Sequence, residues 1–454
     1  SNPMLDQRPD EFPLDLWHYV FDSQKILVKE RWNKFKDKCN PPERLHDVIK
    51  QIMKIDISKE NLSRIAEEPY FRAQCLANLH IYAHPDPSNP PSVKGREYEI
   101  NLTDTSPCTN PMRRTSLLEK AYLYWRTKQL MGRNMIGVSS SAYNNPPLCV
   151  PYPAAITAFI QKHGEKASEA IWKEENQHEV VRLYRLVNDF RDLNNKTKLE
   201  RWPLPYILDL IDKMKGSGRY STEDIEDAFF TVPMKKEHRQ FTAFSTPHGH
   251  FEYLCMGQGL KNAANFFARI VHEMFSSLQI KGKSMSVYQD DVCNFDDDLL
   301  QHLDCQQDIY DIMEDNTLVF KSIKGHLNYS TQRILGHIMS KAGRAPDPTL
   351  VSTINNLAKP TTLEAVRSCL GLAQVAREYV HDLANIIAPI QQMARKGVDI
   401  EKDWGPQQDA AFEHLKKVIT TAPVLALPNL MKKFRVHVDA CRVGRGIGAI
   451  LLQV

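Results

Sequence analysis

The first part of the chain shows the apolar spacing of amphipathic helices. In the segment from Leu45 to Met53 the apolar residues recur at intervals of three and four, and this spacing returns between Ile65 and Leu79. A proline-rich stretch over residues 84–91 then interrupts the periodicity. We therefore predict a helical N-terminal extension over residues 1–95, with the proline-rich stretch as its linker.

Strand and helix patterns are mixed in the next part of the chain. Residues 98–102 read as a strand and residues 116–131 as a helix. The polar, helix-compatible residues 154–181 lie between two strand-like segments, of which the second is Arg185–Phe190. We predict that residues 154–181 form a helical insertion between two strands.

The pattern changes twice more toward the end of the chain. Between Tyr206 and Tyr329 helices and strands alternate without the regular spacing of a doubly wound sheet, which predicts an α+β domain. From Thr362 the pattern is helical, and from Phe434 it predicts two strands, Phe434–Val438 and Ile447–Leu452. A chain of 454 residues is long enough for about three domains.

Composition narrows the class of protein. Apolar residues make up 42% and charged residues 25%, and no apolar run reaches the length of about 20 residues that a membrane span needs, so we expect a soluble protein without a membrane partner. The 9 cysteines form no Cys-x-x-Cys pair, so neither a disulfide framework nor a zinc ribbon is indicated. A net charge of +3 is too small to indicate nucleic-acid binding by itself.

Carboxylates stand in an unusual setting at two places. Asp224 follows a strand-like segment and precedes the helix-like run Ala228–Phe230, while Asp290 and Asp291 are adjacent and have strand-forming residues on both sides. Neighbouring carboxylates in an apolar strand repel one another and are costly to desolvate, so they indicate a cation site. The alternative is that Asp290 and Asp291 form a solvated hairpin turn.

Hard oxygen ligands select Mg²⁺, or Mn²⁺ in its place. Two such ions about 4 Å apart would activate a primer 3′-hydroxyl and stabilise the charge of a triphosphate. Since successive strand residues point to opposite faces, we expect Asp290 to be the principal ligand and Asp291 the weaker one.

These residues resemble the reverse transcriptases of retroviruses and Ty3/gypsy-type LTR retrotransposons. The resemblance rests on the order and spacing of motifs across residues 96–454: Tyr184–Asn194, Trp202–Pro205, Asp224 with Ala228–Phe229, Met256–Leu260, Tyr288–Asp291, Arg333–Ile338, Leu370–Tyr379 and Trp404–Leu425. It implies an α+β right-hand polymerase with fingers and palm over residues 96–350, a thumb and connection over 351–432, and the start of an RNase H-like domain over 433–454.

The resemblance also implies roles for individual residues. Asp224, Asp290, Asp291 and the backbone of Ile225 would bind the two metal ions, and Lys324 would protonate pyrophosphate. Arg185 would contact the triphosphate, Asp227 and Ala228 would offer it backbone amides, Phe229 would exclude a ribose 2′-hydroxyl, and Gln258 would touch the sugar or template. The primer grip would contain Leu335, Gly336 and His337.

The implied activity is RNA-directed and DNA-directed DNA synthesis from dNTPs, with an RNA template, a DNA primer and the RNA/DNA hybrid as partners. The implied location is the cytoplasm, including virus-like particles, with the nucleus as an alternative. An RNA-dependent RNA polymerase would lack an aromatic gate such as Phe229. A domesticated, non-catalytic scaffold remains the alternative, and retention of all three aspartates argues against it. A protease is excluded because Asp104-Thr105-Ser106 lacks the glycine of an Asp-Thr-Gly loop.

Three departures from the family pattern stand out. Gln289 occupies a position that is usually apolar, the lysine expected shortly before Arg185 cannot be placed, and Asp439 is the only acid of the RNase H site that is present. We therefore expect no RNase H activity from this chain alone.

Overall fold

The computed structural model describes residues 7–58, 62–84, 86–88, 91–421, 425, 432–440 and 447–453. The chain forms two compact units. Unit 1 contains residues 1–205, 222–294 and 303–327, and unit 2 contains residues 206–221, 295–302 and 328–454. The chain therefore passes between the two units several times.

A five-stranded sheet with the strand order β1-β10-β5-β9-β8 carries the candidate site. The central strand β5 (Arg219–Asp224) lies between β10 (His326–Tyr329) and β9 (Asp291–Asp296). Strand β8 (Met285–Tyr288) pairs antiparallel with β9 across a two-residue turn, so that Tyr288 faces Asp291. Helix α12 (Ala263–Ile280) packs beside β8 and buries apolar residues at helical spacing, including Phe267, Val271 and Phe275.

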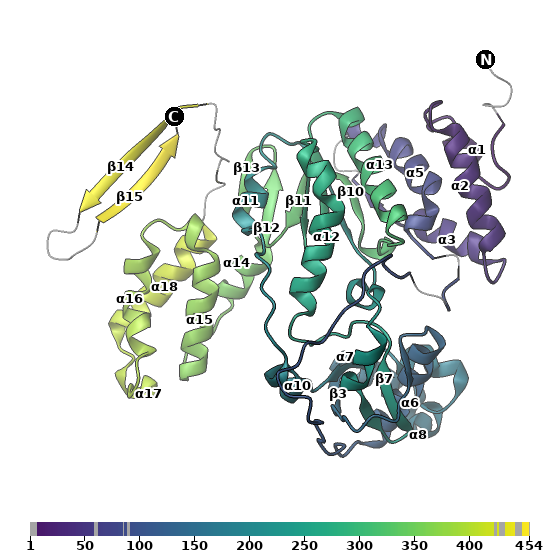
Figure 1. Ribbon diagram of the computed structural model, residues 1–454. Coiled ribbons are helices and arrows are strands. Elements are labelled where there is room, and N and C mark those ends of the chain that lie inside the picture. The colour runs from purple at the N-terminus through teal and green to yellow at the C-terminus, as the bar shows by residue number, and fades with distance from the viewer. Residues whose placement is uncertain are drawn as a thin grey trace. The chain divides into compact units, whose positions relative to one another are not determined.

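The N-terminal extension is helical, as predicted. It contains α1 (Leu14–Trp17), α2 (Lys25–Lys38), α3 (Arg44–Ile52), α4 (Leu62–Ile65) and α5 (Glu68–Ala77). It also supplies β1 (Asp56–Ile57), which pairs parallel with β10 at the edge of the five-stranded sheet. Figure 1 shows α2 and α5 beside α13 (Leu299–Asp315). The extension is therefore part of the same compact unit as the carboxylates.

A second part of unit 1 confirms the predicted insertion. Strands β3 (Pro147–Pro151) and β4 (Tyr184–Asn188) pair antiparallel, and the chain between them forms the short helices α7 (Pro153–His163), α8 (Ala167–Ala170) and α9 (Gln177–Val180). Helix α6 (Leu117–Gly132) begins at a Ser116–Glu119 capping box and packs its apolar face on these helices. A three-stranded sheet of β2 (Ile136–Val138), β7 (Gly249–Tyr253) and β6 (Phe244–Thr246) also belongs to this unit.

The predicted strand over residues 98–102 is wrong. This segment makes only two isolated bridges, Tyr98 with Met234 and Leu102 with Thr197. Between them the backbone N–H of Ile100 donates to Nδ1 of His238 at 2.9 Å. The segment passes from one bridging partner to the next without forming a continuous ladder of strand hydrogen bonds. Its alternation of apolar and polar residues therefore reflects partial burial.

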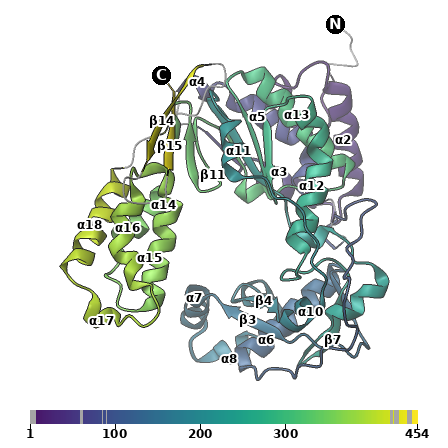
Figure 2. The same cartoon turned by 60° about the vertical axis from the view of Figure 1, so that its left-hand side comes forward.

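Unit 2 combines a small sheet with a helical bundle. Strands β11 (Thr331–Ile334), β12 (His337–Ser340) and β13 (Gly343–Pro346) form an antiparallel sheet. The helices that follow are α14 (Pro348–Asn355), α15 (Leu363–Val375), α16 (Leu383–Met393), α17 (Ile400–Asp403) and α18 (Pro406–Thr420). Figure 2 shows α15, α16 and α18 side by side, around a core that includes Ile390, Phe412 and Leu415.

The last described segment is a hairpin of β14 (Phe434–Ala440) and β15 (Ile447–Gln453), which confirms the two predicted strands. The side chain of Asp439 lies outside the described residues. Within the described ranges, we find no helix with the length and apolar character needed to cross a bilayer.

Candidate active site

Neighbouring strands bring the predicted acids together. Asp224 is the last residue of the central strand β5 and Asp291 is the first residue of β9. The backbone N–H of Ile225 donates to the carbonyl oxygen of Asp290 at 2.9 Å, which ties the end of β5 to the β8–β9 turn. The three acids therefore meet at the same end of these two neighbouring strands.

The electrostatics of Asp291 show how closely the acids crowd. The pKa of its carboxyl is raised to about 7, first because the surrounding protein desolvates it. A hydrogen bond with Asp224 and the negative charges of Asp224 and Asp290 add to this shift. Mutual repulsion of this kind is relieved by a bound cation.

The strand alternation predicted for Asp290 and Asp291 is wrong, because Asp290 belongs to neither β8 nor β9. Strand alternation was expected to separate the two side chains, but Asp290 lies in the two-residue turn with Gln289, which has a φ of 56°. The alternation rule does not apply inside a turn. The structure brings Asp291, and not only Asp290, against Asp224; the ranking of the two as ligands stays a prediction.

Lys324 lies beside the acids. It ends the short 3-10 helix Ser322–Lys324, and its Nζ is 2.6 Å from Oδ2 of Asp224. The backbone N–H of Lys321 donates to the carbonyl oxygen of Asp224 at 2.8 Å and so fixes this helix to the end of β5. The bond to Asp224 raises the pKa of the Lys324 ammonium, which therefore keeps its proton and its positive charge beside the acids.

The donor set suits hard divalent cations. No group of three His, Cys, Asp or Glu side chains in the described part of the chain is arranged to hold an ion as it stands. The ammonium of Lys324 supplies the positive charge that Asp224 faces here. The carboxylates of Asp224, Asp290 and Asp291 nevertheless offer the oxygen ligands that Mg²⁺ and Mn²⁺ prefer, so the residues fit such ions.

The loop after β5 presents the residues expected to meet the nucleotide. Asp227 has a left-handed backbone with a φ of 50° and begins the 3-10 helix Ala228–Thr231. Ala228 is buried, whereas Phe229 and Phe230 are both half-buried. The Phe229 ring packs edge-on against Phe267, with centroids 5.7 Å apart. Burial alone therefore does not distinguish the two rings.

Two of the expected substrate contacts lie together. Arg185 on β4 donates from Nη2 to Oε1 of Gln258 at 3.1 Å. Gln258 precedes Gly259, whose φ of 90° allows the chain to turn toward α12. The guanidinium and the amide thus form one polar group at the surface of unit 1.

The expected primer grip is a tight hairpin in unit 2. Leu335 and Gly336 both have left-handed backbones, with φ of 49° and 83°, and they join β11 to β12. Burial lowers the pKa of His337, the first residue of β12, and its Nδ1 is hydrogen-bonded to the Tyr379 hydroxyl.

Two charged residues next to the predicted site residues were not predicted from the sequence. Arg133, at the end of α6, pairs through Nη2 with Oδ2 of Asp227 at 2.6 Å. Glu223 is fully buried next to Asp224 and accepts hydrogen bonds from Tyr82 Oη at 2.6 Å and Gln306 Nε2 at 2.5 Å. For Glu223, the signal in the sequence was a glutamate at an inward-facing position of a central strand.

Comparisons with known proteins identify the family that each of two segments of the chain matches. Residues 166–339 match the reverse transcriptase (RNA-dependent DNA polymerase) family, and residues 404–454 match the RNase H-like domain found in reverse transcriptase. The chain is 28% identical over 403 residues to the retrovirus-related Pol polyprotein from transposon 297 of Drosophila melanogaster, covering 88% of this chain and 36% of that protein. It is 28% identical over 367 residues to the gypsy Pol polyprotein of the same species, covering 78% and 33%.

Solved structures show the same fold. The foamy viral protease-reverse transcriptase in complex with double-stranded DNA matches with a TM-score of 0.71 and 20% identity, covering 87% of this chain and 64% of that one. The foamy viral protein in complex with an RNA/DNA hybrid matches with a TM-score of 0.67 and 18% identity, covering 90% and 52%. The chain spans about a third of the length of the curated relatives named above. Over residues 166–339 the chain therefore matches the reverse transcriptase family, with LTR-retrotransposon Pol polyproteins among its relatives, and over residues 404–454 it matches the RNase H-like domain found in reverse transcriptase.

Proposed function

We propose that this chain is an RNA-directed and DNA-directed DNA polymerase that extends a primer 3′-hydroxyl with dNTPs. The observation that carries the proposal is the meeting of Asp224, Asp290 and Asp291 at the edge of the sheet, with Lys324 beside them. The complexes of the foamy viral relatives with double-stranded DNA and an RNA/DNA hybrid support an RNA template and a DNA primer as partners.

Asp224, Asp290, Asp291 and the backbone of Ile225 would hold two Mg²⁺ ions, or Mn²⁺ in their place. When bound, such ions neutralise developing charge and lower the pKa of a coordinated hydroxyl. Asp291, whose carboxyl shares a hydrogen bond with Asp224, would then be ionised. The chain's own contribution is to hold these oxygens together on two strands.

Other residues would position the substrates. Arg185 and Gln258, already joined by a hydrogen bond, offer a guanidinium and an amide to the triphosphate and the sugar. The backbone amides of Asp227 and Ala228 would bind phosphate oxygens, and the Phe229 ring would exclude a 2′-hydroxyl. Lys324 would give its Nζ proton to the leaving pyrophosphate. In unit 2, Leu335, Gly336 and His337 would contact the primer strand.

The test is primer extension on poly(rA) and on a DNA template with Mg²⁺ and then Mn²⁺, comparing the wild type with Asp290→Asn and Asp224→Asn. Each substitution removes a metal ligand and no phosphate contact, so we expect extension to fall at least about 1,000-fold, as when a key transition-state group is lost, while primer/template affinity stays within a few-fold. Asp297→Asn, which removes a carboxylate just beyond β9, is the matched control and should retain activity.

Wild-type extension by either Asp290→Asn or Asp224→Asn would refute the two-metal assignment. An inactive wild type that still binds primer/template would instead support a non-catalytic scaffold.

A further inference from the structure

A cavity of about 380 Å³ lies within unit 1, away from the catalytic acids. Its walls are α2, the 3-10 helix Leu79–Ile81 and the segment that follows α13. The basic side chains that line it are Arg31, Lys34, Lys38, His80, His84 and Lys94. Only Glu314 and Asp315 oppose them among its lining residues.

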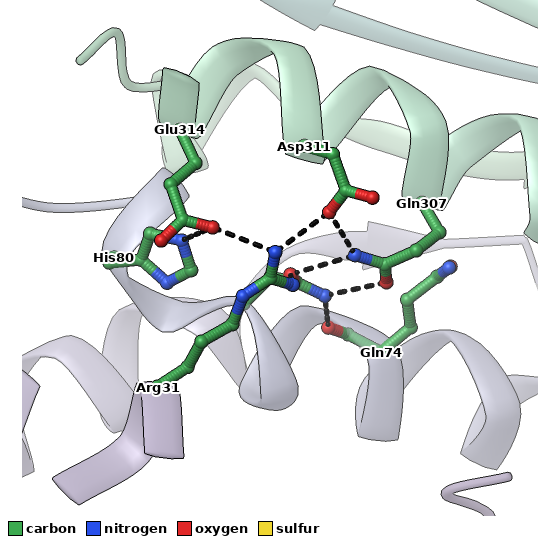
Figure 3. A network of polar contacts seen from close by, with 7 residues as sticks. Arg31, Gln74, His80, Gln307, Asp311 and Glu314 are labelled. Atoms are coloured by element: carbon green, nitrogen blue, oxygen red, sulfur yellow. Dashed lines mark hydrogen bonds and ion pairs between the residues drawn. The ribbon is translucent and has the colours of Figure 1, made fainter. Parts of the chain in front are cut away.

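One of these two carboxylates, Glu314, is already engaged in ion pairs. Figure 3 shows Arg31 reaching from α2 to Glu314 and Asp311 on α13. Nη2 of Arg31 is 2.7 Å from Glu314 and 2.8 Å from Asp311. Nε2 of His80 lies 3.4 Å from the same Glu314 carboxylate. The hydrogen bond with His80 and the charge of Arg31 lower the pKa of Glu314 to about 2, so it is fully ionised and paired.

Three lysines of the cavity remain without such partners. Lys34, Lys38 and Lys94 are exposed, and no carboxylate in the described ranges forms an ion pair with them. Lys34 and Lys38 are one turn apart on α2, so both ammonium groups project from the same face of the helix. The Arg31 network holds this face against α13 and leaves the lysines free to meet an anion.

We propose that this cavity is a second phosphate-binding site of the chain. Clustered lysines with a surplus of positive charge suit the oxygens of phosphate groups. Its volume accommodates the phosphates of a nucleic-acid strand or of a free polyphosphate such as pyrophosphate. The two sources share the same chemistry.

The position of the cavity couples it to the loop after β5. Val319 lines the cavity, and its carbonyl oxygen accepts the backbone N–H of Glu226 at 2.9 Å. Glu226 stands between Asp224, the end of the catalytic strand, and Asp227, which begins the next helix. One backbone hydrogen bond therefore joins the wall of the cavity to the loop that carries the residues proposed to bind the nucleotide.

The test compares Lys34→Gln/Lys38→Gln with Lys50→Gln/Lys54→Gln. The control pair removes two exposed lysines from α3 and the residues just after it, which do not line the cavity, so the change in net charge is equal. Binding of inorganic pyrophosphate and of a 20-nucleotide single-stranded DNA is measured by titration in EDTA, which removes any contribution of divalent ions at the catalytic acids.

We expect the cavity pair to weaken binding of at least one of the two probes about ten-fold, and the control pair to bind both like the wild type. A loss confined to the oligonucleotide, with a salt dependence shallower by about 1.4 in slope for two lost contacts, identifies a strand phosphate as the occupant. A loss confined to pyrophosphate identifies a free polyphosphate. Equal behaviour of the two pairs with both probes would overturn the proposal.

Discussion

Phe229 and Phe230 are adjacent and half-buried, and different partners hold their rings. Phe229 meets Phe267 edge-on, whereas Phe230 stacks on Tyr253 with centroids 6.3 Å apart and an interplanar angle of 16°. Only Phe229 is expected to face the sugar of the incoming nucleotide. The two residues therefore form a natural pair for separating substrate selection from packing.

We predict that Phe229→Val raises the ratio of rNTP to dNTP incorporation at least about ten-fold, because relief of a steric clash admits the 2′-hydroxyl. Phe230→Val, which removes the same volume, should change stability without changing this ratio. The measurement is single-nucleotide incorporation with matched rNTP and dNTP. An unchanged ratio in Phe229→Val would mean that this ring serves packing alone.

Glu314 is a single residue whose charge supports the docking of α2. Its pKa lies at about 2, below the ordinary value of 4.5, so the stability it contributes is complete above pH 4.5 and is lost as the pH falls toward 2. We predict that Glu314→Gln lowers the free energy of unfolding at pH 7 by about 1 kcal/mol, since the pair is partly exposed. Urea unfolding from pH 7 to pH 2 should show the difference between wild type and variant closing below pH 4.5. Asp315→Asn, at the exposed neighbour, should show no such convergence.

At the scale of elements, the β11–β12 hairpin holds Leu335 in a left-handed backbone conformation in which a glycine would be less strained. A left-handed backbone costs a residue with a side chain about 1–2 kcal/mol, and Leu335 has a φ of 49°. We predict that Leu335→Gly raises the free energy of unfolding of unit 2 by roughly 1 kcal/mol while slowing primer extension, because the side chain would be kept for the primer.

Gly336→Ala is the opposite case. No atom lies within 4 Å of a Cβ built at Gly336, so its cost would be conformational only, about 1 kcal/mol of destabilisation. Denaturant unfolding and primer-extension rates of Leu335→Gly and Gly336→Ala test the two predictions. Full extension activity of Leu335→Gly would show that the strained leucine is not needed for contact with the primer.

The elements also show what the sequence could predict. Local periodicity gave α6, the helices between β3 and β4, the bundle after Thr362 and the β14–β15 hairpin, because each buries a face that repeats along its own segment. The meeting of Asp224 with Asp290 and Asp291 followed from motif order. The Tyr82–Glu223 hydrogen bond and the Arg133–Asp227 ion pair join residues far apart in the chain. No local pattern encodes such pairs, and strand alternation misled where Asp290 entered a turn.

At the scale of the molecule, the described residues of the β14–β15 hairpin take no part in the buried apolar cluster of the unit 2 bundle. The described side chains of β14 are exposed, among them Val436 at 57% and Val438 at 65%. A two-stranded hairpin by itself is marginally stable. We predict that removal of residues 426–454, which keeps the bridge of Leu425 with Arg344, shifts the thermal unfolding midpoint by no more than about 1 °C.

Calorimetry of the shortened chain tests this expectation. Phe412→Ala provides the contrast, because Phe412 is buried in the bundle and its loss should cost about 3–5 kcal/mol. A large downward shift on removing the hairpin would show that its apolar face is covered by the rest of the protein.

The two-residue strand β1 has a consequence for the behaviour of the protein in concentrated solution. It occupies the outer side of β10, where Asp56 and Ile57 pair with His326 and Leu327, and the N–H of Ser58 donates to the carbonyl oxygen of Leu327 at 3.0 Å. Without it, β10 would present a row of unpaired backbone groups, which is a template for strand addition from another molecule. The N-terminal extension thus protects the edge of the sheet against edge-to-edge aggregation. A polymerase domain shortened at the proline-rich stretch would lose this protection together with the helices.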